Sequence, residues 1–386
     1  MKNLWDDKVA LKCKDDLDLR VYTSNLLGSN DELVLHGGGN TSVKIGGVLY
    51  VKGSGWDLSS IQKEGFSPVK LDLLLEMAKF EKLSDSDMVR LQHAAMIDES
   101  APNPSVEAIL HALIPYKFVD HTHADAVVTI SNSVNGKEHI ESLYPNFLIV
   151  DYVMPGFELA HKIYELIGSL DWKKIEGIIL HNHGIFTFDD DAKKSYTKMI
   201  DAVTKAEEFL DENAQVNIQR SYEHSGCDIA KITKVFSQFK GYEIHLNINQ
   251  SPLASFYASQ PNLKEFASCG VLTPEHIIRT KRTPLVMEDT NLEEGIKNYI
   301  MEYEKYYMRY ENGETMINPA PNYMIIKNLA VISFGSTKKE ADIINDIVEH
   351  TMLAVLRADK LGGYQSISEA DSFAMEYWEL EQAKLK

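Results

Sequence analysis

An α/β fold is predicted by two features of the 386-residue sequence. Short β-rich apolar runs alternate with longer segments whose apolar residues recur at the spacing of a helix. Glycine clusters join several of the β-rich runs, as tight turns between strands require. The length suits two domains of about 150 residues each, and 44% apolar residues are enough for two hydrophobic cores.

The first half of the chain contains most of the predicted strands, bounded by turn residues. These strands lie over 32–58 in several short pieces, and over 118–123, 147–153 and 177–180. Helical periodicity and capping residues predict the helices between them. They lie over 9–27, 68–96, 157–170 and 189–213, with a further helix that starts at Pro104 and runs through Glu107 and His111.

The second half is predicted to form a smaller α/β domain. The segment 213–227 is polar and has no clear period, so it is the best candidate for a domain boundary. Beyond it lie a tyrosine-rich helix over 292–310, two strands over 323–334 and a long helix over 337–361. We therefore expect a first domain over 1–222 and a second over 223–386.

Charge and cysteine usage limit the classes of partner and the compartment. The formal charge of −18 argues against nucleic-acid or anionic-membrane binding, which need a cationic face. The N-terminus has no apolar core of a signal peptide, and no stretch reaches the roughly 18 apolar residues of a membrane span. The three cysteines form no C-x-x-C pair, which fits a reducing compartment. We expect a cytoplasmic protein with a small-molecule partner.

Two H-x-H pairs, His121/His123 and His181/His183, lie beside predicted strands. On a strand, residues i and i+2 project from the same face, so each pair can offer two imidazoles to one ion. One isolated pair is more often a surface hydrogen-bonding feature, but two pairs favour a metal site. Glu107 is the candidate carboxylate that acts as ligand or moves a proton.

Two glycine-rich loops, His36–Ser42 and Lys52–Gly55, are candidates for phosphate binding. Glycine lets the backbone approach a ligand closely, and exposed N–H groups with Ser, Thr and Asn side chains can surround a phosphate. The sequence contains no G-x-S-x-G elbow, no P-loop motif and no G-x-G-x-x-G that opens a helix. Serine-hydrolase, P-loop and Rossmann interpretations are therefore disfavoured.

Taken together and in this order, five motifs resemble the class II aldolase/adducin family over residues 15–215. They are G-N-x-S at Gly39–Ser42, S-G at Ser54–Gly55, P-S-x-E at Pro104–Glu107, H-x-H at His121–His123 and N-H-G at Asn182–Gly184. The rest of the chain, with TPEHIIRTKRTPLV and HTMLAVLRADKLGGY, is similar to the part that follows the aldolase domain in bacterial rhamnulose-1-phosphate aldolase/alcohol dehydrogenases. We expect this chain to be the aldolase portion without the dehydrogenase domain.

The resemblance implies an α/β/α first domain with a central sheet and a divalent metal, most often Zn²⁺. It implies that His121, His123 and His183 bind the metal and that Glu107 is a ligand or a catalytic acid/base. His181 is not at a ligand position of the family motif. The substrate phosphate is expected to contact Gly39, Asn40, Ser54, Gly55 and Ser105. A looser match places Tyr152 as a second catalytic group that reaches the site of an adjacent subunit.

The implied activity is that of an aldehyde-lyase. A ketose 1-phosphate of the rhamnulose or fuculose type would be cleaved to dihydroxyacetone phosphate and an aldehyde through a metal-stabilised enediolate. Alternatives of the same fold are epimerases, dehydratases or decarboxylases of a sugar phosphate or sugar acid. An alternative of another class is a non-catalytic module, as in adducins.

Two further expectations concern the assembly of the protein and one basic segment. The resemblance implies a homo-oligomer, commonly a tetramer, and a separate dehydrogenase chain is a possible partner. The segment Arg279–Arg282 is unusual in an acidic protein. It is either a group that closes over an anionic substrate or an ordinary solvated run of charge.

Overall fold

The structure is a computed structural model that describes residues 1–219, 228–288 and 291–385. The chain divides into two compact units, the first comprising 1–131 and 136–210, the second 132–135 and 211–386. Part of the predicted boundary segment, including the 222/223 junction and Cys227, lies outside the described residues. No helix among the described residues is long and apolar enough to cross a membrane.

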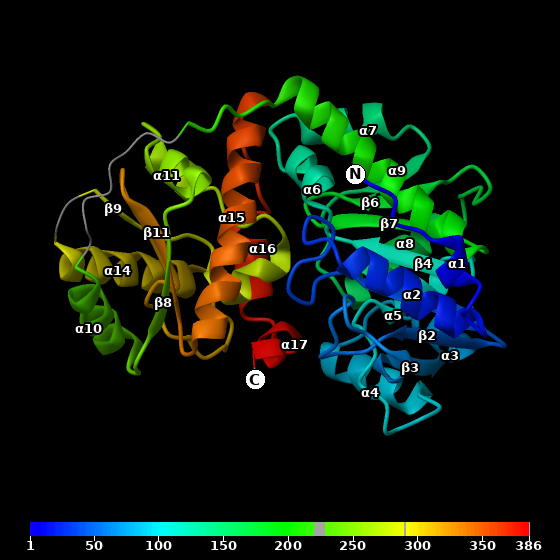
Figure 1. Cartoon of the computed structure of the whole chain (residues 1–386). Coiled ribbons are helices and arrows are strands. Elements are labelled where there is room, and N and C mark those ends of the chain that lie inside the picture. Colours follow the sequence, from blue (N-terminus) through cyan, green and yellow to red (C-terminus); the bar gives the residue numbers. More distant parts are fainter. Residues whose placement is uncertain (220–227, 289–290, 386) are drawn as a thin grey trace. The chain divides into compact units, whose positions relative to one another are not determined.

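The first unit is built on a seven-stranded sheet in the order β3-β2-β1-β4-β7-β6-β5 (Figure 1). Its strands are β1 (Asn40–Ile45), β2 (Val48–Lys52), β3 (Phe66–Lys70), β4 (Phe118–Thr122), β5 (Phe147–Val150), β6 (Gly177–Leu180) and β7 (Gly184–Asp189). Only β5 and β6 pair in parallel, and the other neighbours are antiparallel. The predicted mixed α/β fold with a central sheet is confirmed.

Nine α-helices accompany this sheet among the described residues. They are α1 (Asp7–Ala10), α2 (Asp16–Gly28), α3 (Leu71–Met77), α4 (Asp85–Ala95), α5 (Ala108–Leu113), α6 (Asp125–Ser131), α7 (Gly136–Leu143), α8 (Phe157–Ile167) and α9 (Ala192–Asn213). The single helix predicted over 9–27 is wrong, because Asp15 caps a new helix by accepting a hydrogen bond from Asp18 N. The helical prediction over 68–96 is also wrong at its start, where β3 continues to Lys70.

A buried ion pair fixes α2 on the middle of the sheet. Arg20 of α2 contacts Asp120 of β4, and both side chains are fully buried. The guanidinium also donates to Thr23 Oγ1 at 2.5 Å and to the carbonyl oxygens of Ser42 and Val119, each at 3.3 Å. Helix α2 is therefore held to β1 and β4, the two strands that carry the candidate site.

The second unit has a four-stranded sheet in the order β8-β11-β10-β9, in which β9 and β10 are parallel. The strands are β8 (His245–Asn249), β9 (Leu285–Met287), β10 (Tyr323–Ile326) and β11 (Ala330–Gly335). The helices are α10 (Ile229–Lys240), α11 (Pro252–Ala258), α12 (Leu263–Ala267), α13 (Ile277–Thr280), α14 (Leu292–Tyr310), α15 (Lys338–Lys360), α16 (Glu369–Glu376) and α17 (Glu379–Gln382). The predicted order of two strands and a long helix is thus present as β10, β11 and α15.

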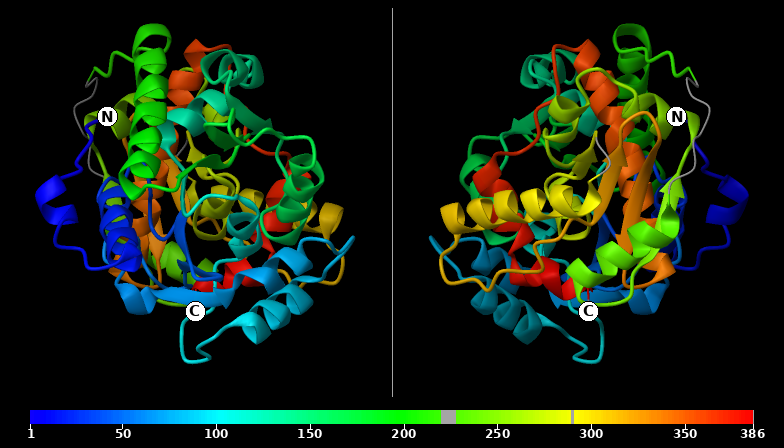
Figure 2. Two further views of the ribbon diagram at one scale, coloured as in Figure 1. Left: turned by 90° about the vertical axis from the view of Figure 1, so that its right-hand side faces the viewer. Right: turned by 90° about the vertical axis from the view of Figure 1, so that its left-hand side faces the viewer.

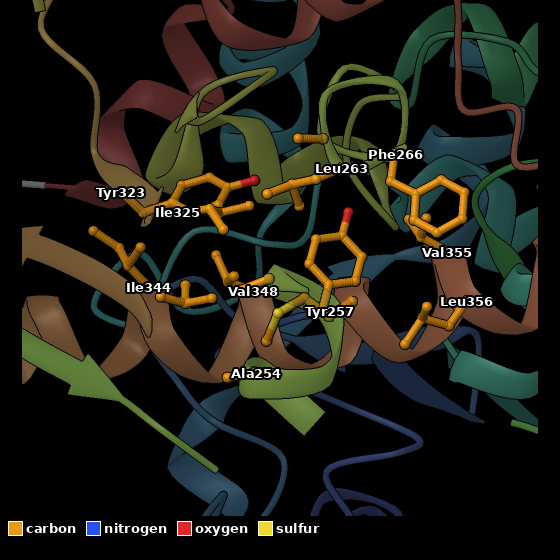
Figure 3. Packing of buried hydrophobic residues seen from close by; sticks show 14 residues of the cluster. Ala254, Tyr257, Leu263, Phe266, Tyr323, Ile325, Ile344, Val348, Val355 and Leu356 are labelled. Carbon is orange, nitrogen blue, oxygen red and sulfur yellow. The ribbon is translucent and has the colours of Figure 1, made fainter. Parts of the chain in front are cut away.

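The core of the second unit lies between its sheet and α15. Val348 and Leu356 of α15 belong to one buried cluster with Tyr257 of α11 and Ile325 of β10 (Figure 3). On another part of the sheet α14, the yellow helix of Figure 2, contacts β9. The apolar spacing that predicted α14 and α15 therefore marks the faces that these helices bury.

A short segment from the first half of the sequence belongs to the second unit. Asn132 Nδ2 donates to Leu272 O at 2.8 Å and to Tyr364 Oη at 3.0 Å. Val134 N donates to Gly363 O at 3.0 Å. Residues 132–135 thus complete the second unit even though they lie between α6 and α7 in the chain.

Candidate metal centre

Three of the four histidines in the H-x-H pairs meet at one end of the central sheet. His121 is on β4, His123 follows that strand, and His183 lies in the turn between β6 and β7. Strands β4 and β7 are antiparallel neighbours, with His121 opposite Phe186. The potential ligand atoms of the three histidines lie within 4.8 Å of one another. The sheet therefore brings together three imidazoles that are up to 62 positions apart in the sequence.

The orientation of the His121 ring is fixed by two neighbouring residues of β7, Ile185 and Phe186. Its Nδ1 lies 3.1 Å from Ile185 O, and because a carbonyl only accepts, Nδ1 carries the proton. The Phe186 ring stacks on the imidazole with centroids 3.9 Å apart. The unprotonated Nε2 is thereby left toward the cluster, which is the tautomer that a metal ligand needs.

The turn that presents His183 depends on two backbone positions. Asn182 has a φ of 59°, a left-handed conformation that asparagine tolerates better than most residues. A Cβ at Gly184 would lie 2.5 Å from Thr122 O and 3.0 Å from ring atoms of His121 and His123. Glycine is required there because β7 approaches the H-x-H strand too closely for any side chain.

Glu107 completes the cluster as a buried carboxylate. Its Oε2 lies 3.5 Å from His121 Nε2 and accepts a hydrogen bond of 2.6 Å from Asn40 Nδ2. Its Oε1 lies 3.9 Å from His183 Nε2, and it accepts no hydrogen bond from any residue that the structure describes. One carboxylate oxygen is therefore held and the other faces the histidines.

The predicted helix around Glu107 is wrong at its N-terminal end. Helix α5 begins at Ala108, and Glu107 occupies its N-cap position. The cause is non-local: Pro104 bridges to Gly53, and Ser105 N donates to Lys52 O at 3.0 Å. Residues before Glu107 therefore pair with the end of β2 rather than starting a helix.

The donor set fits a divalent metal ion. Two nitrogens bound at about 2.1 Å to one tetrahedral ion lie about 3.4 Å apart. The 3.0 Å between the Nε2 atoms of His121 and His123 and the limit of 4.8 Å for the whole set bracket that separation. Three imidazoles with a nearby carboxylate suit Zn²⁺ and several other divalent ions.

The sequence placed His111 on the predicted helix that runs through Glu107 but gave it no role. In the structure, His111 is fully buried, its Nε2 bonds to Asn40 Oδ1, and its Nδ1 lies 2.8 Å from Ser42 Oγ. Burial, and then the positive charges of neighbouring basic groups, holds the pKa of His111 well below its ordinary value. The spacing of four residues between His111 and Glu107 was the only sequence signal that the two side chains belong to one site.

The glycine loops lie directly beside the histidine cluster. Gly39 has a φ of 63°, and a Cβ there would lie 2.7 Å from His121 O. Asn40, which follows it, pairs across the sheet with His121. The first loop is thus packed against the strand that carries the H-x-H pair.

The second loop is joined to both the first loop and the segment before Glu107. Ser54 N donates to Asn103 O at 2.8 Å, and Lys52 Nζ lies 3.4 Å from Gly37 O. The Cβ position of Gly55 has open space around it, with a φ of 83°. Lys52 is a buried cation that the sequence did not single out as a site residue, although it is the first residue of the second glycine loop.

Tyr152 and His181 contact residues near them in the sequence. Tyr152 was predicted on a strand over 147–153, which is wrong, because β5 ends at Val150. The Tyr152 hydroxyl lies 4.0 Å from Met154 Sδ. His181 contacts its neighbour Asn182 through Nδ1 at 2.8 Å and is not a member of the histidine cluster, as its motif position implied.

The basic segment Arg279–Arg282 is not a uniform solvated run. Lys281 is buried, with its Nζ 3.6 Å from Glu376 Oε1 and 3.8 Å from the centroid of the Tyr303 ring. Burial lowers the pKa of Lys281 to about 8. Arg282 donates to Ser268 O at 3.3 Å. Lys281 is therefore a buried cation that pairs with Glu376 inside the second unit.

Comparison with known proteins identifies the family of both halves of the chain. Residues 19–210 match the class II aldolase and adducin N-terminal domain, and residues 227–385 match the second domain of class II aldolases. A curated Bacillus subtilis (strain 168) protein, the uncharacterized oxidoreductase YuxG, is 28% identical over 423 residues. The match covers all of this chain but only 60% of YuxG.

Solved structures give the same result for the first half of the chain. The N-terminal class II aldolase domain of a conserved Thermoplasma acidophilum protein is 40% identical, with a TM-score of 0.50. That match covers 54% of this chain and 99% of the solved one. With a model of this family matching each half, the chain belongs to the class II aldolase and adducin family.

Proposed function

We propose that this protein is a divalent-metal-dependent aldehyde-lyase that cleaves a ketose 1-phosphate, of the rhamnulose or fuculose type, to dihydroxyacetone phosphate and an aldehyde. The observation that supports it is the set of three converging histidines beside a buried carboxylate with one hydrogen-bonded oxygen. Zinc is the ion we propose. When bound, a divalent ion supplies Lewis-acid stabilisation for the negative charge that develops on the ketose oxygens.

The protein's own groups move two protons in this scheme. Cleavage of the C3–C4 bond leaves its electron pair on the ketose fragment, removes a proton from the C4 hydroxyl and adds one at C3. Glu107 starts as the protonated acid and donates its proton to C3 from Oε1, because Asn40 holds Oε2, and it becomes a carboxylate in this step. Tyr152, starting as a phenolate, is our candidate to accept the C4 hydroxyl proton, and both groups return to their starting protonation states by exchange with water.

The phosphate is proposed to lie in the two glycine loops. Gly39 and Gly55 offer backbone N–H groups, and Asn40, Ser54 and Ser105 offer polar side chains, as phosphate binding requires. The buried ammonium of Lys52 lies beside the first loop and would compensate the charge. Binding energy from the phosphate, remote from the bond that breaks, would orient the reacting carbons.

A panel of ketose 1-phosphates, with and without a chelator, tests the reaction. Release of triose phosphate, measured with a coupled dehydrogenase assay, is the expected result, and it should disappear with the chelator. Formation of an isomeric ketose phosphate without triose would instead indicate an epimerase, and loss of water or CO₂ would indicate a dehydratase or decarboxylase. Absence of turnover with tight ligand binding would favour the non-catalytic module.

Variants separate the metal site from the proton transfer. Glu107→Gln should keep the metal and lose most turnover, whereas exposed Glu99→Gln should change neither. His121→Ala and His183→Ala should lose the ion in elemental analysis, and His181→Ala should retain it. Stoichiometric metal in both ligand variants would refute the ligand assignment.

We also propose a homotetramer and a separate dehydrogenase partner. The support for the partner is that YuxG, named an oxidoreductase, extends well beyond the region that matches this chain. Light scattering of the purified protein tests the tetramer. Affinity capture with the tagged protein, followed by an assay for aldehyde oxidation in the captured fraction, tests the partner.

A further inference from the structure

Four buried side chains form a continuous hydrogen-bonded row that ends on Glu107. Ser42 bonds to His111, His111 bonds to Asn40, and Asn40 bonds to Glu107. The most exposed of the four, Asn40, has 7% of its surface accessible. The row links β1, where Ser42 and Asn40 lie, to α5 and its N-cap.

The chemistry of the groups fixes the direction of every bond in the row. A carboxylate only accepts, so Asn40 directs its NH₂ group to Glu107 and its Oδ1 to His111. His111 must then carry its proton on Nε2, which leaves Nδ1 to accept from the Ser42 hydroxyl. All three donors therefore point toward Glu107, and a doubly protonated His111 would break the row at Ser42.

The row restrains rotation of the Glu107 carboxylate. With Oε2 held at 2.6 Å by Asn40, Oε1 is the oxygen that faces His183 Nε2 at 3.9 Å. An Asn40 amide without His111 could turn by 180° and present its Oδ1 to the carboxylate, which would repel it. His111 prevents this turn because only Oδ1 can accept its Nε2 proton.

We propose that His111 is a positioning residue that, through Asn40, keeps Oε1 of Glu107 aimed at the reacting carbon. His111 is not a member of the histidine cluster, its ring nitrogens bond to Asn40 and Ser42, and Ser42 is its orienting partner. This inference rests on the proposed function, since it assigns Oε1 as the proton-transferring atom. A purely structural role for His111 is the alternative, because its ring also contacts Phe186 edge-on at 5.4 Å.

The tautomer of His111 is the first test, and it does not depend on activity. Long-range ¹H–¹⁵N spectra of the metal-free protein near pH 7, with His111 assigned by its substitution, should show protonated Nε2 and unprotonated Nδ1. A proton on Nδ1, or on both nitrogens, would overturn the row. This result stands whether or not any ketose phosphate is cleaved.

Kinetics provide the second test. His111→Phe keeps the ring volume and the contact with Phe186 but removes both hydrogen bonds, so kcat should fall about 10–100-fold, as for other residues that orient a metal-site group. KM and bound metal should stay unchanged, and His111→Gln, which retains an N–H donor, should recover part of the loss. Surface substitution His93→Phe is the matched control.

Coupling to Glu107 distinguishes positioning from general destabilisation. In the Glu107→Gln background, His111→Phe should have little further effect on kcat, because the group that it positions is already lost. An equal loss in both backgrounds, or an unchanged kcat in an active wild-type background, would refute the proposal. If His111→Phe does not fold, Ser42→Ala tests the same row by removing one bond.

Discussion

The buried pair of Arg20 and Asp120 should be a dominant local contribution to the stability of the first unit. Asp120→Asn removes the countercharge and leaves a fully buried guanidinium whose remaining acceptors are neutral oxygens. Breaking one side of such a pair costs about 3–5 kcal/mol, because the other charge stays uncompensated in the interior. That is about a fifth or more of the roughly 5–15 kcal/mol by which typical domains are stable.

Urea denaturation of the metal-free protein, followed by circular dichroism, measures this loss. The control is Asp87→Asn, which removes the exposed, chemically matched pair with Arg90 and should cost at most about 1 kcal/mol. The double variant Arg20→Met/Asp120→Leu should recover most of the stability, since no unpaired charge remains. A loss below about 1 kcal/mol in Asp120→Asn, or a double variant worse than the single one, would refute the reasoning.

Three further predictions follow from single positions. Gly184→Ala should weaken metal binding about tenfold or more in a competition titration, because its Cβ would lie 2.5 Å from a carbonyl oxygen, whereas Gly168→Ala has open space. Glu376→Gln should lower stability by about 3–5 kcal/mol in thermal denaturation, because Lys281 stays buried without its partner. The pKa of His111 is depressed, so below about pH 6.5 the unfolded chain binds more protons than the folded one. The free energy of unfolding therefore decreases as the pH is lowered, and His111→Phe should remove up to about 1.4 kcal/mol per pH unit of that dependence.

Part of the histidine cluster was predictable from local geometry, because alternation along a strand placed His121 and His123 on one face. His183 lies 62 positions after His121, and it came only from the resemblance of N-H-G at Asn182–Gly184 to the family motif. Bringing the two strands together needed only a sheet, which the composition and turns predicted. The motif order then selected the histidine at 183 over the one at 181.

The contacts around Glu107 were not predictable in the same way. The start of α5 depends on the bridge between Pro104 and Gly53, which are 51 positions apart. The bond between Asn40 and Glu107 spans 67 positions, and no periodicity in either segment encodes it. The buried position of Lys281 was not among the two alternatives for the Arg279–Arg282 segment, because its partner Glu376 lies 95 positions later in the sequence.

Residues 132–135 impose a minimum delay on the folding of the second unit during synthesis. The acceptors of the Asn132 side chain lie 140 and 232 positions later, at Leu272 and Tyr364. At about 5–20 residues per second, the ribosome needs roughly 10–50 s to add the intervening 232 residues. During that interval Asn132 cannot form its hydrogen bond to Tyr364, so the last steps of folding follow the synthesis of almost the whole chain.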